Sequence, residues 1–456
     1  FNTQAPDGGF VLSLSWRPLI PWLYFGCILM VLGGMLGSLA TRVAGNMLTN
    51  GAGQLLKGEK PALKDLLLTP GNVGRIADQL ANMRGAAMKV GQLMSMDAGD
   101  ILPPALAEIL SRLRSDADPM PKQQVDEVLS QALGDEWADQ FLYFSYAPIA
   151  AASIGQVHKV ILPTGEMLAL KIQYPGVKQS IDSDVDNVAT LLSITGLLPK
   201  GVDFKPLLDE AKRQLHTEAD YNTEADMLER YKAFVGGDER FAVPNVYREF
   251  TRDNVLAMTF MPSEPIESQL DADQGTRDNI ASALFELFFT ETFEHHLIQT
   301  DPNFANYRYD PESGKVILLD FGATREYPSD FVNLYRELMS GVFHSDSERV
   351  RSAVLNIGLM SENLSPDLQD FIVSMCFDAC EPILTAGKYD FGSSDLGKRL
   401  QERGMSLSDN EAFWHVPPAN SVFLHRKLGG VFLLASNLKA RVNVNAIAAE
   451  HISKKC

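Results

Sequence analysis

The hydrophobic and polar positions of this chain form four successive patterns. An uncharged apolar segment over 18–41 comes first, and apolar residues then recur at helical spacing up to residue 145. Short apolar runs separated by turn residues dominate 146–260, and helical spacing returns over most of 261–456. The patterns predict an α+β protein with one membrane-length segment, a helical extension, a strand-rich part and a mainly helical part.

The segment over 18–41 is long enough to cross a membrane. As a helix, its 24 residues would span about 36 Å, and a bilayer core is about 30 Å thick. More basic residues follow the segment than precede it, which predicts that the bulk of the chain, after a tail over 1–17, lies on the cytoplasmic face. We therefore predict a single-pass transmembrane helix. A signal peptide ending near residue 40 and an amphipathic soluble helix over 35–48 are the alternatives.

A long amphipathic helix is predicted between Asn72 and Asp97, where apolar residues recur at helical spacing. The opposite side of this helix is small or weakly polar apart from Lys89, so we expect another part of the protein to pack on it. Lys89 and Gln92 are three residues apart and are therefore neighbours on that side. They would be presented together to whatever covers the helix; a solvated lysine beside an ordinary glutamine is the alternative.

Short strands joined by tight loops are predicted from Tyr146 onward, followed by strands over 246–250 and 255–260. Lys171 lies at the end of the apolar strand over 168–172. A lysine in a sheet core needs an anion beside it, whereas a lysine on an edge strand faces water. The sequence downstream favours the first interpretation.

Two aspartates and an asparagine lie on predicted loops in the second half of the chain. Asp301 precedes Asn306 by five residues, and Asp320 follows a buried strand over 316–319. Carboxylate and amide oxygens are hard ligands that suit Mg²⁺, which shares them with nucleotide phosphates. Together with Lys171 these residues predict a magnesium-nucleotide site.

Composition narrows the class of protein. The chain has 40 Lys and Arg against 58 Asp and Glu, which gives a formal net charge of −18, and 45% of its residues are hydrophobic. This balance is typical of a globular enzyme and argues against nucleic acid as a partner, because that requires a concentrated basic surface. Four scattered cysteines are too few for a disulfide framework and fit a reducing compartment.

Other potential metal ligands are interpreted as structural. Cys376 and Cys380 are four residues apart on a predicted helix and could form half of a metal site, but small buried hydrophobic residues are the preferred interpretation. His295 and His296 are adjacent and would point about 100° apart on a helix, so they cannot easily chelate one ion. His158 is expected to be packed or hydrogen-bonded.

The ordered set of a strand lysine, a D-x-x-x-x-N loop and DFG resembles the protein-kinase-like fold. Three further motifs resemble those of the UbiB/AarF atypical kinases. They are the KxGQ motif at Lys89-Val90-Gly91-Gln92, the alanine-rich loop at Ala150-Ala151-Ala152-Ser153 and the ExD motif at Glu218-Ala219-Asp220. The resemblance covers residues 45–440. It implies a bilobal fold with a helical KxGQ extension over 42–145, a small lobe over 146–260 and a large lobe over 261–456.

The resemblance also implies roles for individual residues. Lys171 would hold the α- and β-phosphates of ATP, paired with Glu224 on a helix over 203–234, although the ExD acids are other candidates for this pairing. Asp301 would be the catalytic-loop aspartate. Asn306 and Asp320 would hold Mg²⁺. ATP would also contact the alanine-rich loop (Ala150, Ala151, Ala152, Ser153) and Met261 in the hinge, and the regulatory residues would be Lys89, Gln92, Glu218 and Asp220.

The chain departs from an ordinary kinase in two places. Alanines replace the glycines of the phosphate loop, which adds Cβ atoms and restricts the backbone, so the grip on the nucleotide must differ. After Asp320 the chain passes within a few residues into a helix predicted over 330–342, which leaves no long activation loop. Protein phosphorylation in trans is therefore disfavoured. The resemblance implies an ATPase-like or small-molecule activity that supports ubiquinone biosynthesis.

One departure concerns the family itself, whose members commonly have histidine where this chain has Gln299 and Asn303. Glutamine does not titrate as histidine does, so a role of that histidine in proton transfer or orientation is in question. The leading hypothesis is a membrane-tethered Mg-ATP enzyme. The alternatives are a nucleotide-binding scaffold for a lipid-biosynthetic complex and a small-molecule phosphotransferase.

Partners and location follow from the membrane segment and the family. We expect contact with anionic membrane lipid and with ubiquinone precursors or biosynthetic proteins, and Gly33 and Gly37 would permit a homodimer through close helix pairing. The mixed apolar and basic stretch over 420–447 could touch lipid or close the large lobe, and we favour closure. The absence of an Arg-rich leader favours a bacterial inner membrane over a mitochondrion.

Overall fold

The computed structural model of the protein describes residue 83 and residues 85–87, 89–90, 119–194, 205–408 and 417–453. The predicted transmembrane segment, Gln92 and most of the predicted helix over 72–97 lie outside the described residues. Within that helix, residues 85–87 and 89–90 are helical, as predicted. The chain divides into two compact units, and nearly all the described residues belong to the unit made of Lys89–Leu102, Asp118–Val185 and Val202–Cys456. The following description concerns that unit, except that residues 186–194, at the end of one of its helices, belong to the other unit.

Among the described residues, five strands form an antiparallel sheet in the order β1-β3-β4-β6, with β2 pairing on β3. The strand ending near Lys171 and the strand over 255–260 are confirmed as β4 and β6. The strands are β1 (Tyr143–Phe144), β2 (Ala150–Ala151), β3 (Gly155–Ile161), β4 (Met167–Gln173) and β6 (Val255–Thr259).

The predicted strand over 246–250 is wrong. Val246 makes a single β-bridge, after which Arg248–Phe250 form a 3₁₀ turn. The turn directs the ring of Phe250 into the core, where its centroid lies 5.1 Å from that of Phe141. Burial of an aromatic side chain is worth more here than continued strand pairing.

The hydrophobic core of this lobe joins the sheet to the residues before it. Helix α7 (Lys122–Leu133) and the 3₁₀ turn η1 (Trp137–Gln140) contribute Leu129 and Trp137, which pack with Leu168 of β4. Residues that the sequence pattern groups with the helical extension thus cover the small-lobe sheet.

Between β4 and β6 the described residues form three helices, and the single helix predicted over 203–234 is wrong. The helices are α8 (Val177–Ile194), α9 (Lys205–Glu218) and α10 (Tyr221–Val235). The break lies at Asp220, whose carboxylate accepts a hydrogen bond from the backbone N–H of Asn222 and so caps α10. Aspartate is a strong N-cap residue, and capping here starts a new helix.

Two small sheets flank the loops that carry Asp301 and Asp320. The first has the order β5-β10-β9-β7, and the second pairs β8 with β11. Their strands are β5 (Phe241–Ala242), β7 (Glu264–Pro265), β8 (Leu297–Gln299), β9 (Tyr307–Asp310), β10 (Lys315–Leu318) and β11 (Thr324–Glu326).

The remaining large-lobe elements are mainly helical. They are the 3₁₀ turn η3 (Ile266–Asp271), α11 (Gln274–Thr290), the π-turn η4 (Glu291–His295), the 3₁₀ turn η5 (Phe304–Asn306), α12 (Ser329–Phe343), α13 (Ser347–Ile357), α14 (Pro366–Ala379), α15 (Glu381–Leu384), α16 (Leu396–Ser408), α17 (Ala419–Asn437) and α18 (Val444–Ser453), with a short ladder of β12 (Tyr389–Asp390) and β13 (Arg441–Val442).

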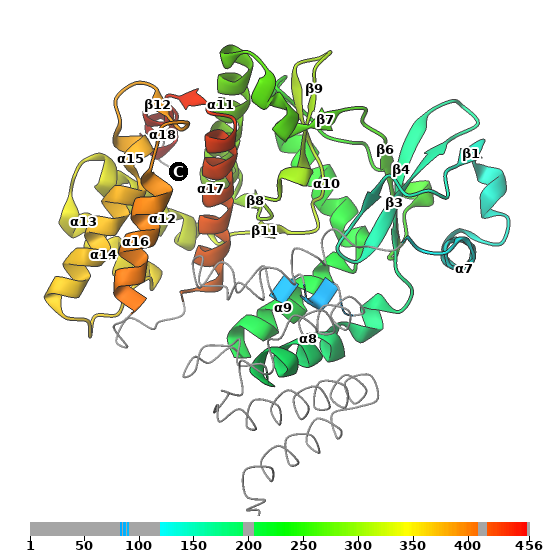
Figure 1. The fold of residues 1–456 in the computed structure, drawn as a ribbon, viewed down its shortest axis with the longest axis horizontal. Helices are drawn as coiled ribbons and strands as arrows, with labels where there is room; N and C mark the ends of the chain where they lie inside the picture. Colours follow the sequence, from blue (N-terminus) through cyan, green and yellow to red (C-terminus); the bar gives the residue numbers. More distant parts are fainter. Residues whose placement is uncertain are drawn as a thin grey trace, which may run out of the picture. The chain divides into compact units, whose positions relative to one another are not determined.

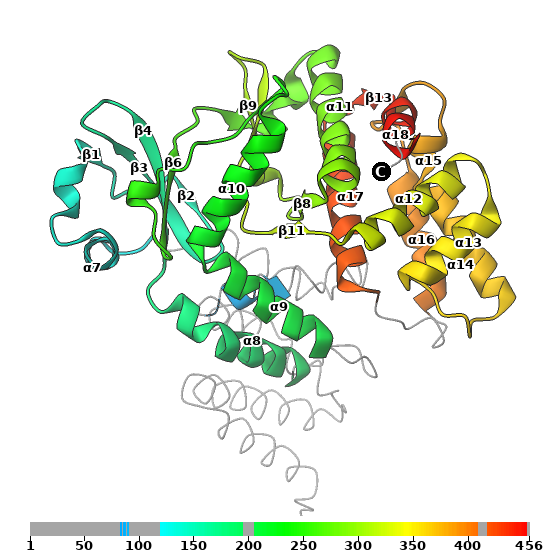
Figure 2. The same ribbon diagram turned by 180° about the vertical axis from the view of Figure 1, so that it is seen from behind.

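Helix α11 is central to this lobe. It packs against α17 and α18, and Figures 1 and 2 show α17 lying along α11 from both sides. The prediction that the stretch over 420–447 closes the lobe agrees with this packing. The apolar spacing over 277–296 predicts one helix at the start of the large lobe, and the structure has α11 there, extended by the π-turn to His295.

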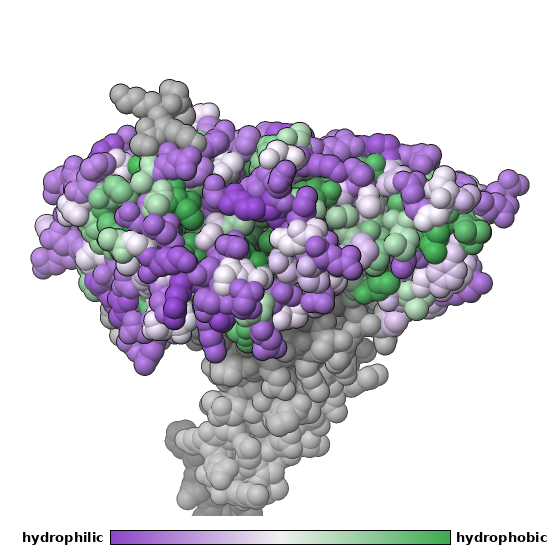
Figure 3. All heavy atoms as spheres, turned by 90° about the horizontal axis from the view of Figure 1, so that it is seen from above, coloured by the Kyte–Doolittle hydropathy of each residue, from purple (hydrophilic) through white to green (hydrophobic). Residues whose placement is uncertain are grey.

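None of the helices in the described part of the chain is long and apolar enough to cross a bilayer. On the face shown in Figure 3, hydrophilic side chains separate smaller hydrophobic groups. The exposed large hydrophobic residues include Leu142 and Tyr143 at the start of β1 and Leu433 on α17.

Candidate active site

An ion pair between Lys171 and Glu224 joins the sheet to α10. The Lys171 ammonium donates to both carboxylate oxygens of Glu224, at 2.8 Å and 2.9 Å. It also lies 3.6 Å from Oδ1 of Asp320 and 5.1 Å from the centre of the Tyr221 ring. Of the acids that the sequence offered as partners of Lys171, Glu224 is therefore the one that contacts it, and Asp320 approaches from the other side.

The charges of this cluster support one another. Burial alone would lower the pKa of Lys171, but Asp320 and Glu224 raise it well above its ordinary value, so the ammonium stays charged. Burial raises the pKa of Glu224 to about 7, with Lys171 opposing the shift. Partial burial would raise the pKa of Asp320, but the charge of Lys171 and the N–H of Gly322 outweigh it, so this carboxylate is ionised. A fixed cation beside an ionised carboxylate suits a magnesium-bound phosphate chain.

Asp320 is held in an uncommon backbone conformation. Its φ is 60°, in the left-handed region, which costs a non-glycine residue about 1–3 kcal/mol. The N–H of Gly322 donates to its Oδ1 at 3.2 Å, and the Gln299 amide donates to its carbonyl at 3.2 Å. The next residue, Phe321, is fully buried, with its ring 4.9 Å from that of Tyr231. Burying Phe321 while Asp320 faces Lys171 fixes the orientation of this turn.

The Asp301 loop is anchored by its own asparagine and by α17. The Asn306 amide donates to Oδ2 of Asp301 at 3.1 Å and to its carbonyl at 3.3 Å. Arg426 of α17 donates to the other carboxylate oxygen, Oδ1, at 2.7 Å. The N–H of Leu319 donates to the carbonyl of Asn306 at 2.9 Å, which ties this loop to the strand before Asp320. The structure thus places Asn306 and Asp320 on neighbouring segments, and both carry oxygen atoms of the type that Mg²⁺ prefers.

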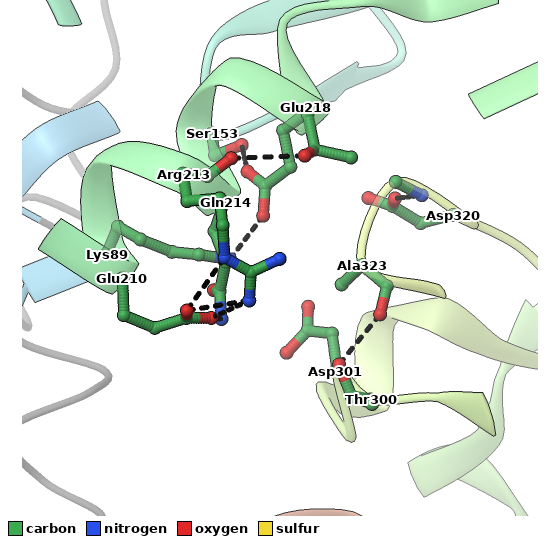
Figure 4. Close-up of polar contacts among 12 residues, drawn as sticks. Lys89, Ser153, Glu210, Arg213, Gln214, Glu218, Thr300, Asp301, Asp320 and Ala323 are labelled. Carbon is green, nitrogen blue, oxygen red and sulfur yellow. Dashed lines mark hydrogen bonds and ion pairs between the residues drawn. The ribbon is translucent and has the colours of Figure 1, made fainter. Parts of the chain in front are cut away.

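Lys89 forms an ion pair with Glu218 at the end of α9, as Figure 4 shows. The hydroxyl of Ser153 donates to the other oxygen of Glu218 at 3.3 Å. The KxGQ lysine, the alanine-rich loop and the first acid of the ExD motif therefore meet at one carboxylate. Lys89 is 5% exposed, so its interpretation as a solvated lysine is wrong.

The alanine-rich loop is a tight hairpin. Ala150 and Ala151 form β2 and pair with Val157 and Gln156 of β3, and the N–H of Ala152 donates to the carbonyl of Gly155 at 2.8 Å. Met261 lies half-buried in the connection after β6, where its carbonyl accepts a hydrogen bond from Ser263. Asp220 faces the start of α10 as its cap, so it does not contact Lys171.

Hydrogen bonds and ring packing surround the histidines that the sequence analysis interpreted as structural. His158 is fully buried between the amide of Gln156 and the carbonyl of Ser145, at 2.7 Å from each. His295 stacks on Phe234. Over the described part of the chain no group of three His, Cys, Asp or Glu side chains is arranged to bind a metal. Cys376 on α14 and Cys380 at its end are half-buried, whereas the sequence suggested buried hydrophobic residues.

Sequence reasoning missed a buried cation under this site. Lys427 of α17 is 2% exposed, and its ammonium lies 2.9 Å from the hydroxyl of Tyr307, 3.4 Å from Oε2 of Glu291 and 3.4 Å from Oε1 of Gln299. Glu291 is fully buried at the start of the π-turn and also accepts from the hydroxyl of Tyr231. The only signal in the sequence was the mixture of basic and apolar residues over 420–447.

Gln299 bridges the buried cation and the DFG turn. Its Oε1 accepts from Lys427, while its Nε2 donates to the carbonyl of Asp320. The amide therefore links Lys427 to the backbone of the DFG turn.

Comparisons with known proteins agree with this geometry. The model of the ABC1 atypical kinase-like domain matches residues 112–354. The chain is 36% identical over 422 residues to the mitochondrial atypical kinase COQ8 of Saccharomyces cerevisiae, covering 92% of this chain and 84% of that one. It is 34% identical over 421 residues to the mitochondrial atypical kinase coq-8 of Caenorhabditis elegans, covering 91% of this chain and 55% of that one.

A solved structure is also similar. Rv3197 of Mycobacterium tuberculosis, in a complex with erythromycin, matches with a TM-score of 0.59 and 25% identity, covering 90% of this chain and 97% of that one. The similarity to the COQ8 relatives extends over most of this chain, and the family model covers more than half of it. The resemblance read from the motifs is confirmed: the chain belongs to the ABC1 family of atypical kinases, which includes the COQ8 and UbiB/AarF proteins.

Proposed function

We propose that this protein binds Mg-ATP at the Lys171 cluster and uses it in an ATPase-like or small-molecule phosphoryl-transfer reaction that supports ubiquinone biosynthesis. The observation that carries the proposal is the contact of Lys171 with both Glu224 and Asp320, next to the Asp301–Asn306 loop. The names of the COQ8 relatives support the biosynthetic assignment.

Each residue has a defined task in this proposal. Lys171 neutralises the α- and β-phosphates, and Glu224 keeps it in position. Asn306 and Asp320 would hold Mg²⁺, which neutralises phosphate charge when bound. Asp301 orients the hydroxyl or water that attacks and accepts its proton. Met261 and the alanine-rich loop line the nucleotide.

A small molecule or water is a better acceptor than a protein in this proposal. Strand β11 begins at Thr324, two residues after Gly322, and pairs with β8. Helix α12 then begins at Ser329. This short connection supports the expectation that no platform for a peptide substrate follows the DFG turn.

We further propose that residues 18–41 attach the protein to a membrane, where ubiquinone precursors and anionic lipids are available. The glycine pair in this segment would allow a homodimer. The two COQ8 relatives named above are mitochondrial proteins, whereas the sequence alone favours the cytoplasmic face of a bacterial inner membrane.

The test is phosphate release from Mg-ATP by the full chain in anionic liposomes, with and without a ubiquinone-like phenol. Asp301→Asn should no longer release phosphate but should still bind the nucleotide, because Asp301 acts on the attacking group. Asp320→Asn should lose binding of the magnesium nucleotide. Asp367→Asn, at an exposed position on α14, is the matched control and should behave as wild type. Unchanged release by Asp301→Asn would overturn the catalytic assignment.

A second candidate function is a nucleotide-binding scaffold without turnover. It is favoured by the engagement of both Asp301 oxygens, one by Arg426 and one by Asn306, which leaves this carboxylate less free to accept a proton. For a scaffold, neither wild type nor Asp301→Asn would release phosphate above background, and both would rescue a deletion strain.

A further inference from the structure

A pocket of about 370 Å³ opens between α9 and the segment that follows the DFG turn. Small-molecule sites commonly begin at about this volume. Gly322 lines the pocket and borders the Lys171 cluster, because a Cβ atom there would lie 3.4 Å from Oδ1 of Asp320 and 3.4 Å from Oε2 of Glu224. The pocket walls include Arg213, Gln214, Glu218, Thr300, Arg325 and Glu326.

Two arginines in this wall share one carboxylate. Arg213 donates to Glu210 from Nε and Nη2, at distances between 2.6 Å and 2.9 Å. Arg325 donates to the same carboxylate at 3.0 Å. Glu210 also accepts from the amide of Gln214 at 2.9 Å, so its oxygens are fully used. Among the described residues, one of the two guanidinium charges is therefore left without its own counter-ion.

The other acids of the pocket do not compensate this charge. Glu218 is paired with Lys89, and Glu326 is paired with Arg230. With Arg213 and Arg325, these groups carry four positive charges against the three negative charges of Glu210, Glu218 and Glu326. The excess of one positive charge therefore belongs to the two arginines of the wall, which share Glu210 behind them.

The Arg325 side chain is held in place by its contacts. Its guanidinium lies 4.2 Å from the centre of the Phe423 ring, and its side chain is 12% exposed. Its Nη1 is buried and has no hydrogen-bond partner in the part of the chain that the structure describes. An unpaired guanidinium nitrogen inside a protein is costly, and an oxyanion is the group that best satisfies it.

We propose that this pocket is an oxyanion site, separate from the site for the nucleotide phosphates, that holds a phosphate or carboxylate group of a small molecule. Thr300 is part of the pocket wall and directly precedes Asp301, and in Figure 4 the Arg213 guanidinium and the Asp301 carboxylate point toward the same space. A molecule anchored here by its anionic group would present its remaining atoms to Asp301. The proposal concerns binding and does not require turnover.

The test is thermal unfolding of the full chain with inorganic phosphate, and separately with propionate, against chloride at matched ionic strength. Wild type should show a saturable rise in Tm with at least one of the two oxyanions. Arg213→Gln and Arg325→Gln should weaken this response at least about tenfold, because each removes half of the guanidinium pair. Arg349→Gln, at a surface ion pair on α13, should respond as wild type.

A further variant separates the two anion sites. Lys171→Met removes the cation of the nucleotide site and should keep the phosphate response. Loss of the response in Lys171→Met would place phosphate at the nucleotide site and overturn the proposal. A full response in Arg213→Gln, which is half-exposed and safe to substitute, would also overturn it, as would the absence of a saturable response in wild type.

Discussion

The guanidinium of Arg426 lies 2.7 Å from a carboxylate oxygen of Asp301, although the two residues are 125 positions apart in the chain. Both side chains are largely buried, with 13% and 19% exposure. Helix α17 therefore supplies the counter-charge to Asp301. This contact lowers the cost of holding an ionised carboxylate in a partly buried site and fixes its direction.

Arg426→Gln should reduce phosphate release by about 10- to 100-fold, because it leaves Asp301 unpaired and free to turn away from the attacking group. Nucleotide affinity should stay within about twofold, since Lys171 and Asp320 are untouched. The measurements are steady-state phosphate release and nucleotide titration. Arg441→Gln, an exposed residue after α17, is the control. Equal release by wild type and Arg426→Gln would show that Arg426 does not position Asp301.

Gly430→Ala should destabilise the protein and impair phosphate release. A Cβ atom at this position of α17 would lie 2.0 Å from Cβ of Pro302, directly after Asp301. The helix would have to move away from the loop and would carry Arg426, one turn earlier, with it. Strain of this kind in a packed site typically costs about 1–3 kcal/mol.

Gly429→Ala is a matched control on the same helix. A Cβ atom there has no neighbour within 4 Å. Because alanine favours the helix over glycine by about 1 kcal/mol, this variant should be as stable as wild type or more stable. The free energy of unfolding and the rate of phosphate release are measured for both variants. Similar losses of stability and release in the two variants would contradict close packing of Gly430 on Pro302.

Gln299 and Lys427 should act as a unit. Gln299→Ala removes the donor to the Asp320 carbonyl and one acceptor of Lys427, at an expected cost of about 1–3 kcal/mol. Lys427→Met leaves Glu291 buried without its cation. The double variant should cost less than the sum of the two single variants, with a coupling of at least about 0.5 kcal/mol. Urea unfolding measures this cycle. As a control, a double-mutant cycle of Gln299→Ala with the more distant Lys315→Met should be additive. Additivity in the Gln299–Lys427 cycle would show that these two side chains do not act together.

Glu291 should make the stability of the protein depend on pH. Burial raises the pKa of Glu291 from 4.5 to about 7, with Lys427 opposing the shift. Between these values the folded protein binds a proton that the unfolded chain has released. The stability that Glu291 contributes therefore falls as pH rises from 4.5 to 7, by at most about 3 kcal/mol.

The measurement is urea unfolding of wild type and Glu291→Gln at pH 5, 6, 7 and 8. The stability of wild type relative to Glu291→Gln should decline from pH 5 to pH 7 and then level off. Glu362→Gln, at an exposed position, should give no such trend. A constant difference between wild type and Glu291→Gln across this range would contradict a raised pKa at Glu291.

Much of the site was predictable because its signals are local. The spacing from Asp301 to Asn306 lies within one loop, and Asp320 directly follows an apolar strand, so the sequence placed all three at strand ends. The strand carrying Lys171 was predictable from its apolar run. The helix over 203–234 was not, because helical periodicity alone does not reveal that Asp220 caps a new helix.

The sequence by itself determined the family, the strand and loop positions of Lys171, Asp301, Asn306 and Asp320, and the expectation that Lys89 is covered. Only the tertiary structure decided that Glu224 rather than Asp220 pairs with Lys171, that Gly430 lets α17 approach Asp301, and that Arg426 and Lys427 lie beneath the site. The reason is physical. A basic residue on an amphipathic helix has the same local pattern whether it faces water or a buried carboxylate, and which one it meets depends on contacts between residues more than a hundred positions apart.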